Sequence, residues 1–151
     1  MTSRQLPSEW TEPMERLVAA AAAARPKAYA PYSGYLVGAA VLDAQGSVFT
    51  GVNVENISYG ATICAERGAV AKMVSEGGGP IVAVAVVTVD GGTPCGMCLQ
   101  VLVELAADAH SVWVGSADLG GLRRVYRLAD LMPASFASES VRRTLSDGGT
   151  S

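Results

Sequence analysis

The pattern of apolar and polar positions divides the chain into helices and strands, beginning with an alanine-rich helix. This helix is predicted over residues 12–27, where alanines fill the middle and Pro13 falls in the first turn, a position that tolerates proline. Thr11 or Ser8 would cap its start, and Pro26 would end or bend it.

Strands and further helices are predicted in the rest of the chain. The stretch 81–90 is apolar at nearly every position, which is typical of a central strand covered on both faces. The predicted strands cover 35–43, 47–53, 81–90, 111–115 and 122–127, and the later helices start at Ile63 or Cys64, at Cys95 and at Leu128. The chain is therefore expected to be an α/β protein with a three-layer α/β/α architecture, in which helices flank a central mixed sheet of about five strands.

Length and charge narrow the class of protein. The 151 residues suffice for a single domain with its own core, and no repeat or linker divides them. The formal net charge is −3 without a run of lysine or arginine, so nucleic acid is disfavoured as a partner and small neutral molecules are favoured.

The location of the protein can also be predicted from its apolar segments. The longest apolar run, 81–87, is too short to span a membrane, and residues 1–9 lack the apolar segment of a secretory signal. We therefore expect a cytoplasmic protein without membrane contact. The polar segment 137–151 is expected to be a mobile tail or to pack on a neighbouring subunit.

Three cysteines stand in surroundings that suggest a metal site. Cys64 opens the stretch Cys-Ala-Glu-Arg, and Cys95 and Cys98 form a Cys-x-x-Cys pair directly after Pro94. Three cysteines cannot all pair within one chain, so reduced, metal-bound thiols are the better interpretation. Three thiolates fill three corners of a tetrahedral zinc site and leave the fourth for water. Glu66 follows Cys64 by two residues and would handle the protons of that water.

The predicted positions of these cysteines explain how the two stretches would meet. Cys64 and Cys95 fall at helix starts, where unpaired N–H groups stabilise thiolates, and Cys98 lies one turn beyond Cys95. Two neighbouring strand-to-helix turns would converge at the carboxyl ends of their strands. Arg67 would hydrogen-bond a ligand sulfur and offset part of the negative charge. A redox dithiol or a structural zinc knuckle would explain the Cys-x-x-Cys pair alone, but the only histidine, His110, has no ligand spacing.

Taken together, these motifs resemble those of the short, homotetrameric, zinc-dependent cytidine deaminases over about residues 29–136. The matching stretches are PYSGYLVGAA (31–40), GVNVEN (51–56), SYG (58–60), CAER (64–67), PCGMCLQ (94–100) and LMPASF (131–136). Zinc nucleobase deaminases share the cysteine ligands, the non-ligand glutamate and the P-C-x-x-C pair. The resemblance implies a cytidine-deaminase-like fold, one Zn²⁺ per subunit, and hydrolysis of cytidine or 2′-deoxycytidine to the uridine product and ammonia in pyrimidine salvage.

The resemblance also implies a role for each site residue. Cys64, Cys95 and Cys98 would hold zinc, and Glu66 would be the acid and base. Asn53 and Glu55 would hydrogen-bond the ribose hydroxyls, the backbone N–H of Ala65 would meet the pyrimidine carbonyl, and Tyr35 would pack near the base in place of the usual phenylalanine. Tyr32, Tyr59 and Phe136 would reach a neighbouring subunit's site, so that a homotetramer completes each pocket. Plain core or interface packing is the alternative interpretation of Tyr32 and Tyr59.

The sequence departs from the family pattern in two places, and two alternative functions stay open. Leu99 stands where the family typically has arginine, which leaves Arg67 alone to neutralise the thiolates, and Gly34 and Leu36 leave the preferred pyrimidine open. One alternative is a deaminase of another aminated nucleoside, such as a blasticidin-type antibiotic, against which Glu55 argues. The other is a catalytically inactive, zinc-stabilised binding protein. A tRNA- or DNA-editing deaminase is disfavoured by the acidic balance and by a cysteine where those enzymes usually have histidine.

Overall fold

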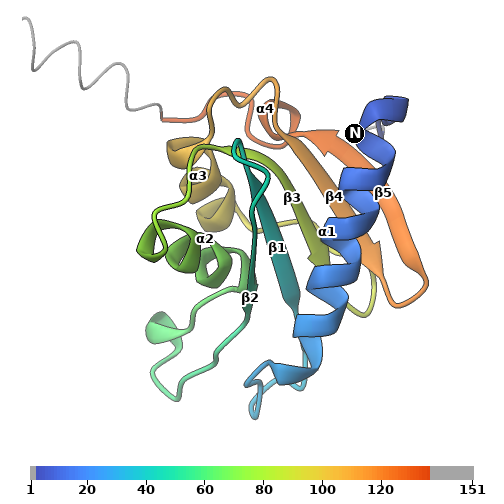
Figure 1. Cartoon of the computed structure of the whole chain (residues 1–151). Helices are drawn as coiled ribbons and strands as arrows, with labels where there is room; N and C mark the ends of the chain where they lie inside the picture. Colours follow the sequence, from blue (N-terminus) through green and yellow to red (C-terminus); the bar gives the residue numbers. More distant parts are fainter. Residues whose placement is uncertain (1–2, 137–151) are drawn as a thin grey trace, which may run out of the picture.

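One five-stranded sheet forms the centre of the molecule, whose computed structural model describes residues 3–136 (Figure 1). The strands lie in the order β2-β1-β3-β4-β5. β3 and β4 are parallel, and the other neighbouring pairs are antiparallel. The strands are β1 (Gly38–Asp43), β2 (Val48–Val52), β3 (Ile81–Val87), β4 (Trp113–Asp118) and β5 (Gly121–Arg127). The prediction of a mixed sheet of about five strands is confirmed.

Helices cover both faces of this sheet. The α-helices are α1 (Thr11–Ala24), α2 (Ala65–Ser75), α3 (Gly96–Leu105) and α4 (Leu128–Leu131), and short 3₁₀ helices cover Ser8–Trp10, Arg25–Lys27 and Tyr59–Ala61. Figure 1 shows α1 on one face and α2 and α3 on the other. The sheet divides the core into two buried clusters, one built around α1 and the other around α2, α3 and α4. The three-layer α/β/α prediction is therefore confirmed.

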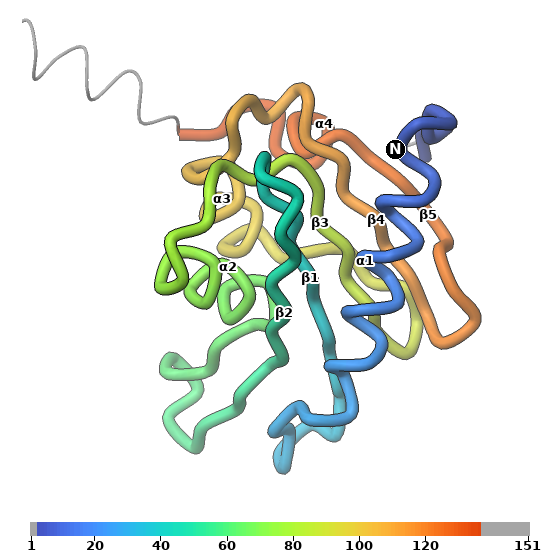
Figure 2. Tube along the Cα trace, viewed as in Figure 1, coloured from blue at the N-terminus to red at the C-terminus, as the bar shows by residue number. Residues whose placement is uncertain are grey.

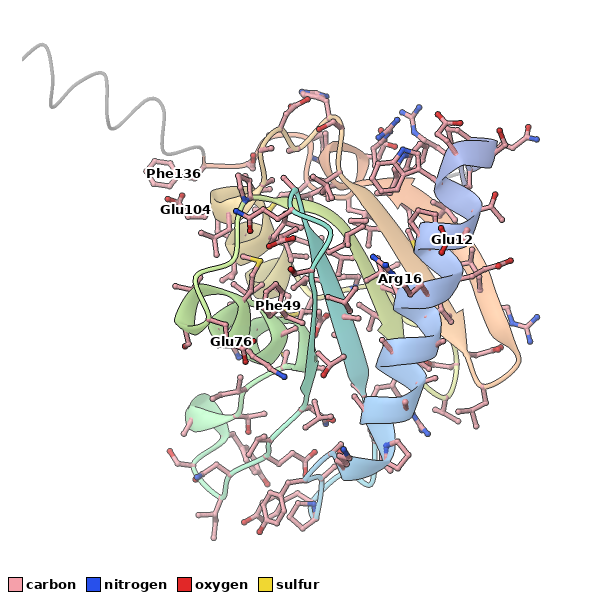
Figure 3. The ribbon with its side chains drawn as sticks, viewed as in Figure 1. Glu12, Arg16, Phe49, Glu76, Glu104 and Phe136 are labelled. Atoms are coloured by element: carbon pink, nitrogen blue, oxygen red, sulfur yellow. The ribbon has the colours of Figure 1, made fainter. Side chains whose placement is uncertain are left out.

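The central strand β3 shows how the sequence sets these layers. Val84 and Val86 pack in the cluster on the α2 and α3 side, whereas Ala83 and Ala85 pack in the cluster on the α1 side. Because successive side chains point to opposite faces, nearly every side chain of a strand covered on both sides is buried and apolar. Phe49 of β2 also faces the α2 side and is buried there (Figure 3).

Three segments of the chain emerge together at one end of the sheet. Gly38 begins β1 and pairs with Val52 at the end of β2 and with Val87 at the end of β3. The segments before β1, after β2 and after β3 therefore lie at the same end, as the tube in Figure 2 shows. This end carries the candidate site.

The element boundaries differ from the prediction in a few places. β1 begins at Gly38 rather than at Tyr35, because the side chain of Asn53 binds the Val37 N–H and the Tyr35 carbonyl, groups that a longer strand would pair with backbone. Neither predicted cap of the first helix is present. Its N-cap is Trp10, which makes no side-chain cap hydrogen bond because a 3₁₀ turn leads directly into the helix.

Two further predictions concern the membrane and the C-terminal tail. Within residues 3–136, each helix is too short or too polar to span a bilayer. The predicted tail, 137–151, lies outside the described residues.

Candidate metal centre and active site

The three thiol groups lie together where α2 and α3 begin. All three Sγ atoms lie within 4.8 Å of one another. Cys64 Sγ is 4.0 Å from Cys95 Sγ, and Cys95 Sγ is 3.5 Å from Cys98 Sγ. Tetrahedral zinc with Zn–S bonds of about 2.3 Å places its sulfur ligands roughly 3.8 Å apart. The cysteines form no disulfide, and their spacing fits one zinc ion with a fourth position open.

The fold brings these cysteines together through the starts of two helices. Cys64 is the N-cap of α2 and Cys95 is the N-cap of α3, both with extended backbone conformation, which confirms the predicted helix starts. α2 follows β2 and α3 follows β3. The two turns converge at the carboxyl ends of their strands as predicted, although β1 lies between β2 and β3 in the sheet. The starts of α2 and α3 lie close together, because both helices cover the same face of the sheet and both β2 and β3 end at the same end of it.

Glu66 occupies the first turn of α2, beside the thiols. It is buried, with 4% of its surface exposed. Burial raises the pKa of this carboxyl group, and the negative charge of Cys64 raises it further. A carboxyl group whose pKa is shifted toward neutrality can both accept and return a proton at working pH.

Arg67 lies against the same thiols from the next position of α2. Its Nη2 donates a hydrogen bond of 2.9 Å to the carbonyl of Thr62. Burial lowers the pKa of Arg67, but Cys64 and Cys98 outweigh that effect and raise it. The neighbouring Cys98 and Arg67 together lower the pKa of Cys64 to about 5, despite its partial burial. The interaction with Cys64, together with burial, raises the pKa of Cys98.

Leu99 has apolar surroundings, which disfavour a charged side chain. It is buried and packs in the apolar cluster of α2, α3 and the sheet. Arg67 is therefore the guanidinium that interacts with the ligand thiols within residues 3–136.

A cavity of about 250 Å³ opens beside the thiols. This size suits a small molecule rather than a polymer. Five predicted site residues line it together with Cys64 and Cys95: Tyr35, Asn53, Glu55, Ala65 and Glu66. Tyr32 and Tyr59 instead line an adjoining cavity, which shares Ser33, Glu55 and Thr62 with the first.

Hydrogen bonds within the protein already hold Asn53 and Glu55 in place. Asn53 Oδ1 accepts from the Val37 N–H at 2.8 Å, and Nδ2 donates to the Tyr35 carbonyl at 2.8 Å. Glu55 accepts from the Tyr32 N–H at 2.8 Å, and from the N–H and the hydroxyl of Ser33. The Ser33 hydroxyl is the main cause of the lowered pKa of Glu55. Each side chain keeps free hydrogen-bonding capacity that can face the cavity.

The aromatic residues expected to reach a neighbour are exposed. Tyr32 and Tyr59 pack edge to face with ring centroids 6.4 Å apart, and 79% of the Tyr59 surface is exposed. Phe136 is 70% exposed and lies on the outside of the molecule, where its carbonyl accepts from Gln100 Nε2 at 2.8 Å (Figure 3). It lines neither cavity.

Some cavity residues were missed by the sequence analysis. Ser33, Thr88 and Gly92 line the cavity, and Asp90 binds the Tyr35 hydroxyl at its edge. A usable signal is the cluster of small and polar residues directly after β3, at the end of the sheet where sites form.

Comparison with known proteins agrees with this geometry. The family model of the cytidine and deoxycytidylate deaminase zinc-binding region matches residues 11–114. A cytidine deaminase of Halalkalibacterium halodurans is 43% identical over 129 residues, which cover 84% of this chain and 96% of that protein. One from Mycobacterium tuberculosis is 43% identical and covers 77% of this chain and 84% of its own. The crystal structure of cytidine deaminase from Burkholderia pseudomallei is 44% identical, with a TM-score of 0.73, and covers 80% of this chain and 97% of that one.

The fold and the site thus define a three-layer α/β/α protein with a three-cysteine zinc site. The chain belongs to the cytidine and deoxycytidylate deaminase family.

Proposed function

We propose that the protein is a cytidine deaminase, which hydrolyses cytidine or 2′-deoxycytidine to uridine or 2′-deoxyuridine and ammonia in pyrimidine salvage. The observation that carries the proposal is the placement of a buried carboxyl group, Glu66, beside three thiols and a cavity of nucleoside scale. The names of relatives at about 40% identity support it.

Zinc would be held by Cys64, Cys95 and Cys98 and would leave one position open toward the cavity. When bound, the ion supplies an activated water, because coordination lowers the pKa of water toward neutrality. Arg67 would offset part of the negative charge of the three thiolates from its place beside Cys64 and Cys98.

Glu66 would carry the protons of the reaction. It accepts a proton from the attacking water and delivers it to ring N3, which makes C4 of the pyrimidine more electrophilic. After attack at C4, Glu66 takes the remaining proton from the hydroxyl group now on C4 and transfers it to the exocyclic amino group, so that the C–N bond breaks, the C4 carbonyl forms and ammonia leaves. The raised pKa of the buried carboxyl group suits this double role, because it must hold a proton between two transfers.

The cavity also offers groups that would orient the nucleoside. Ala65 is the first residue of α2, so its N–H has no partner within the helix and can donate to the pyrimidine carbonyl. Asn53 and Glu55 would bind the ribose hydroxyls with their free capacity, and Tyr35 would pack near the base. A site built to bind the sugar hydroxyls rejects a free pyrimidine base, which has none, because the polar groups of the site would lose their partners.

We further propose a single-domain subunit that assembles into a cytoplasmic homotetramer. The exposed rings of Tyr32, Tyr59 and Phe136 support this assembly, since large exposed aromatic groups around a site are typical of interfaces. In the tetramer these rings would complete the pocket of a neighbouring subunit.

A turnover assay joined to metal analysis tests the function. The purified protein is expected to hold one zinc per subunit and to release ammonia from cytidine with the matching change in absorbance. Glu66→Gln should keep zinc and the assembly but lose turnover by at least a hundredfold, as expected when a general acid and base is removed. Glu76→Gln, at the exposed end of the same helix, is the matched control and should keep full activity.

Three results would count against the proposal. Normal ammonia release by Glu66→Gln would exclude Glu66 from the mechanism. Turnover of a blasticidin-type nucleoside but not of cytidine would change the substrate. Zinc binding without turnover of either compound would favour a binding protein.

A further inference from the structure

A hydrogen bond joins the two walls of the cavity at one edge. The Tyr35 hydroxyl donates to Asp90 Oδ1. Gly38 pairs with Val87 at the end of the β1–β3 ladder, and Tyr35 and Asp90 each lie three residues beyond that pair. The side-chain bond therefore continues the antiparallel register past the end of the sheet, where the described residues show no backbone hydrogen bond between the two segments.

On the metal side, this bond belongs to a network that fixes the turn before α3. Asp90 Oδ1 also accepts from the Thr88 hydroxyl at 2.9 Å, and Thr88 Oγ1 accepts from the Gly92 N–H at 2.8 Å. The Ser116 hydroxyl of β4 binds the Gly91 carbonyl from the opposite side. Two residues after Gly92, Pro94 leads directly to the ligand Cys95.

On the other side, the bond reaches the groups proposed to bind the ribose. The Tyr35 carbonyl accepts from Asn53 Nδ2 at 2.8 Å, and the Tyr35 N–H donates to Ser33 Oγ at 3.0 Å. Ser33 in turn donates to Glu55. A continuous chain of hydrogen bonds thus connects Asn53 and Glu55 to the turn that delivers Cys95.

The fit around the hydroxyl group is close. A Cβ on Gly92 would stand 3.3 Å from Tyr35 Oη, so the ring tip lies directly against the turn. Tyr35 and Gly92 both line the cavity, while Asp90 lies outside it and is exposed. The tip of Tyr35 therefore closes one edge of the cavity and is anchored from outside.

We propose that Asp90 is a positioning residue, which acts through the Tyr35 hydroxyl to hold the ribose wall of the cavity against the turn that carries Cys95. This inference rests on the proposed function for its substrate. The Tyr35–Asp90 hydrogen bond, called the tie below, forms without substrate, and neither residue contacts the reacting atoms or the metal. Loss of this hydrogen bond weakens the binding of substrate and of transition state by the same amount, so KM rises and kcat stays the same.

Two single variants and their combination test the tie. Tyr35→Phe removes only the hydroxyl, and Asp90→Ala removes its acceptor. Each is expected to raise KM for cytidine about five- to tenfold, the effect of losing one ordinary hydrogen bond, with kcat within about twofold. The double variant should match Asp90→Ala rather than multiply the two effects, because both changes break the same bond. Asp90→Asn retains an acceptor and should restore a KM near that of the unchanged protein.

Hydrogen exchange of the Gly92 amide gives a readout that needs no substrate. Exchange should accelerate at least threefold in Tyr35→Phe, because the turn loses its anchor. Tyr29→Phe is the matched control: its hydroxyl makes no hydrogen bond within the described residues, and it should leave both KM and exchange unchanged.

A KM for Tyr35→Phe within twofold of the unchanged protein would overturn the proposal, as would multiplied effects in the double variant. A variant that melts at a lower temperature with an unchanged KM would show a structural role only. If the unchanged protein does not deaminate cytidine, the proposed function fails, and unchanged Gly92 exchange would then refute the tie independently.

Discussion

Gly51 of β2 lies directly against Ala65 of α2, closer than any side chain would permit. A Cβ on residue 51 would stand 2.3 Å from the Ala65 carbonyl oxygen and 2.2 Å from the Ala69 nitrogen. Both are backbone atoms, so neither can move aside as a flexible side chain would. This close approach sets the position of the first turn of α2, which holds Cys64 and Glu66.

We therefore predict that Gly51→Ala displaces α2 and damages the metal site. The free energy of unfolding should fall by about 3 kcal/mol, at the upper end for overpacking, because backbone must shift. Zinc content should fall with it, as measured by metal analysis after purification.

Gly68→Ala is the matched control for this change. Gly68 lies on the same helix, but its Cβ would meet the Val52 carbonyl oxygen at 3.5 Å, an ordinary contact. Alanine favours a helix over glycine, so this variant should be neutral or gain up to about 1 kcal/mol. Equal losses in the two variants would contradict the role of the close approach.

Arg67 should control zinc affinity, because its guanidinium lies beside two ligand thiols. Arg67→Gln removes the charge and is expected to weaken zinc binding about tenfold, the usual effect of losing a group that supports metal ligands. Competition with a chelator of known affinity measures the change. Arg16→Gln on α1, on the opposite face of the sheet, serves as the control (Figure 3). An unchanged zinc affinity in Arg67→Gln would show that the thiolates need no such support.

The sequence predicted the layers and the metal ligands well, because both depend on local patterns. The unbroken apolar run of β3 requires cover on both faces, and cysteines at helix starts have few alternative partners. The extent of β1 was not predictable from its alternation, because the competing partner of Tyr35 and Val37 is a side chain sixteen or more residues away. The network around Asp90 was missed for the same reason, since it depends on the register of β1 against β3.

Leu99 illustrates what the resemblance alone could not settle. The sequence comparison predicts that Leu99→Arg changes zinc affinity or the pH–rate profile. The structure adds a cost, because Leu99 is buried among apolar side chains. We expect Leu99→Arg to lower the free energy of unfolding by about 3 kcal/mol, measured by urea denaturation of the zinc-loaded protein. Unchanged stability would mean that the new guanidinium finds the thiolates, and a rise in zinc affinity should then accompany it.

Asp43 gives the fold a predictable response to acid. This buried carboxylate accepts hydrogen bonds from the N–H groups of Gln45, Ser47 and Gly79 at 3.0, 2.8 and 3.0 Å. Burial alone would raise its pKa, but these bonds outweigh burial and lower the pKa below the ordinary value of 3.8. The stabilisation is therefore present above pH 3.8 and is lost as the pH falls through the lowered folded-state pKa.

Asp43→Ala should cost about 3 kcal/mol near neutral pH, because it leaves buried N–H groups without partners. The difference in unfolding free energy between the unchanged protein and Asp43→Asn should shrink as the pH is lowered from 5 toward 2, as measured by urea denaturation at each pH. A difference that stays constant over that range would contradict the assigned role of the charge.

The number of protons released when zinc binds should depend on pH, because the pKa values of Cys64 and Cys98 are shifted in opposite directions. In the metal-free protein the pKa of Cys64 is about 5, so at neutral pH this group is already a thiolate and has no proton to lose. The pKa of Cys98 is raised, so it must give up its proton when it becomes a ligand.

Calorimetry in buffers of different ionisation enthalpy should therefore show at least one proton released per zinc at neutral pH. The number should increase as the pH is lowered toward 5, where Cys64 begins to carry a proton, and zinc affinity should fall over the same range. Cys98→Ser should release about one proton fewer per zinc at neutral pH, whereas zinc binding without release in the unchanged protein would mean that Cys98 is not a ligand.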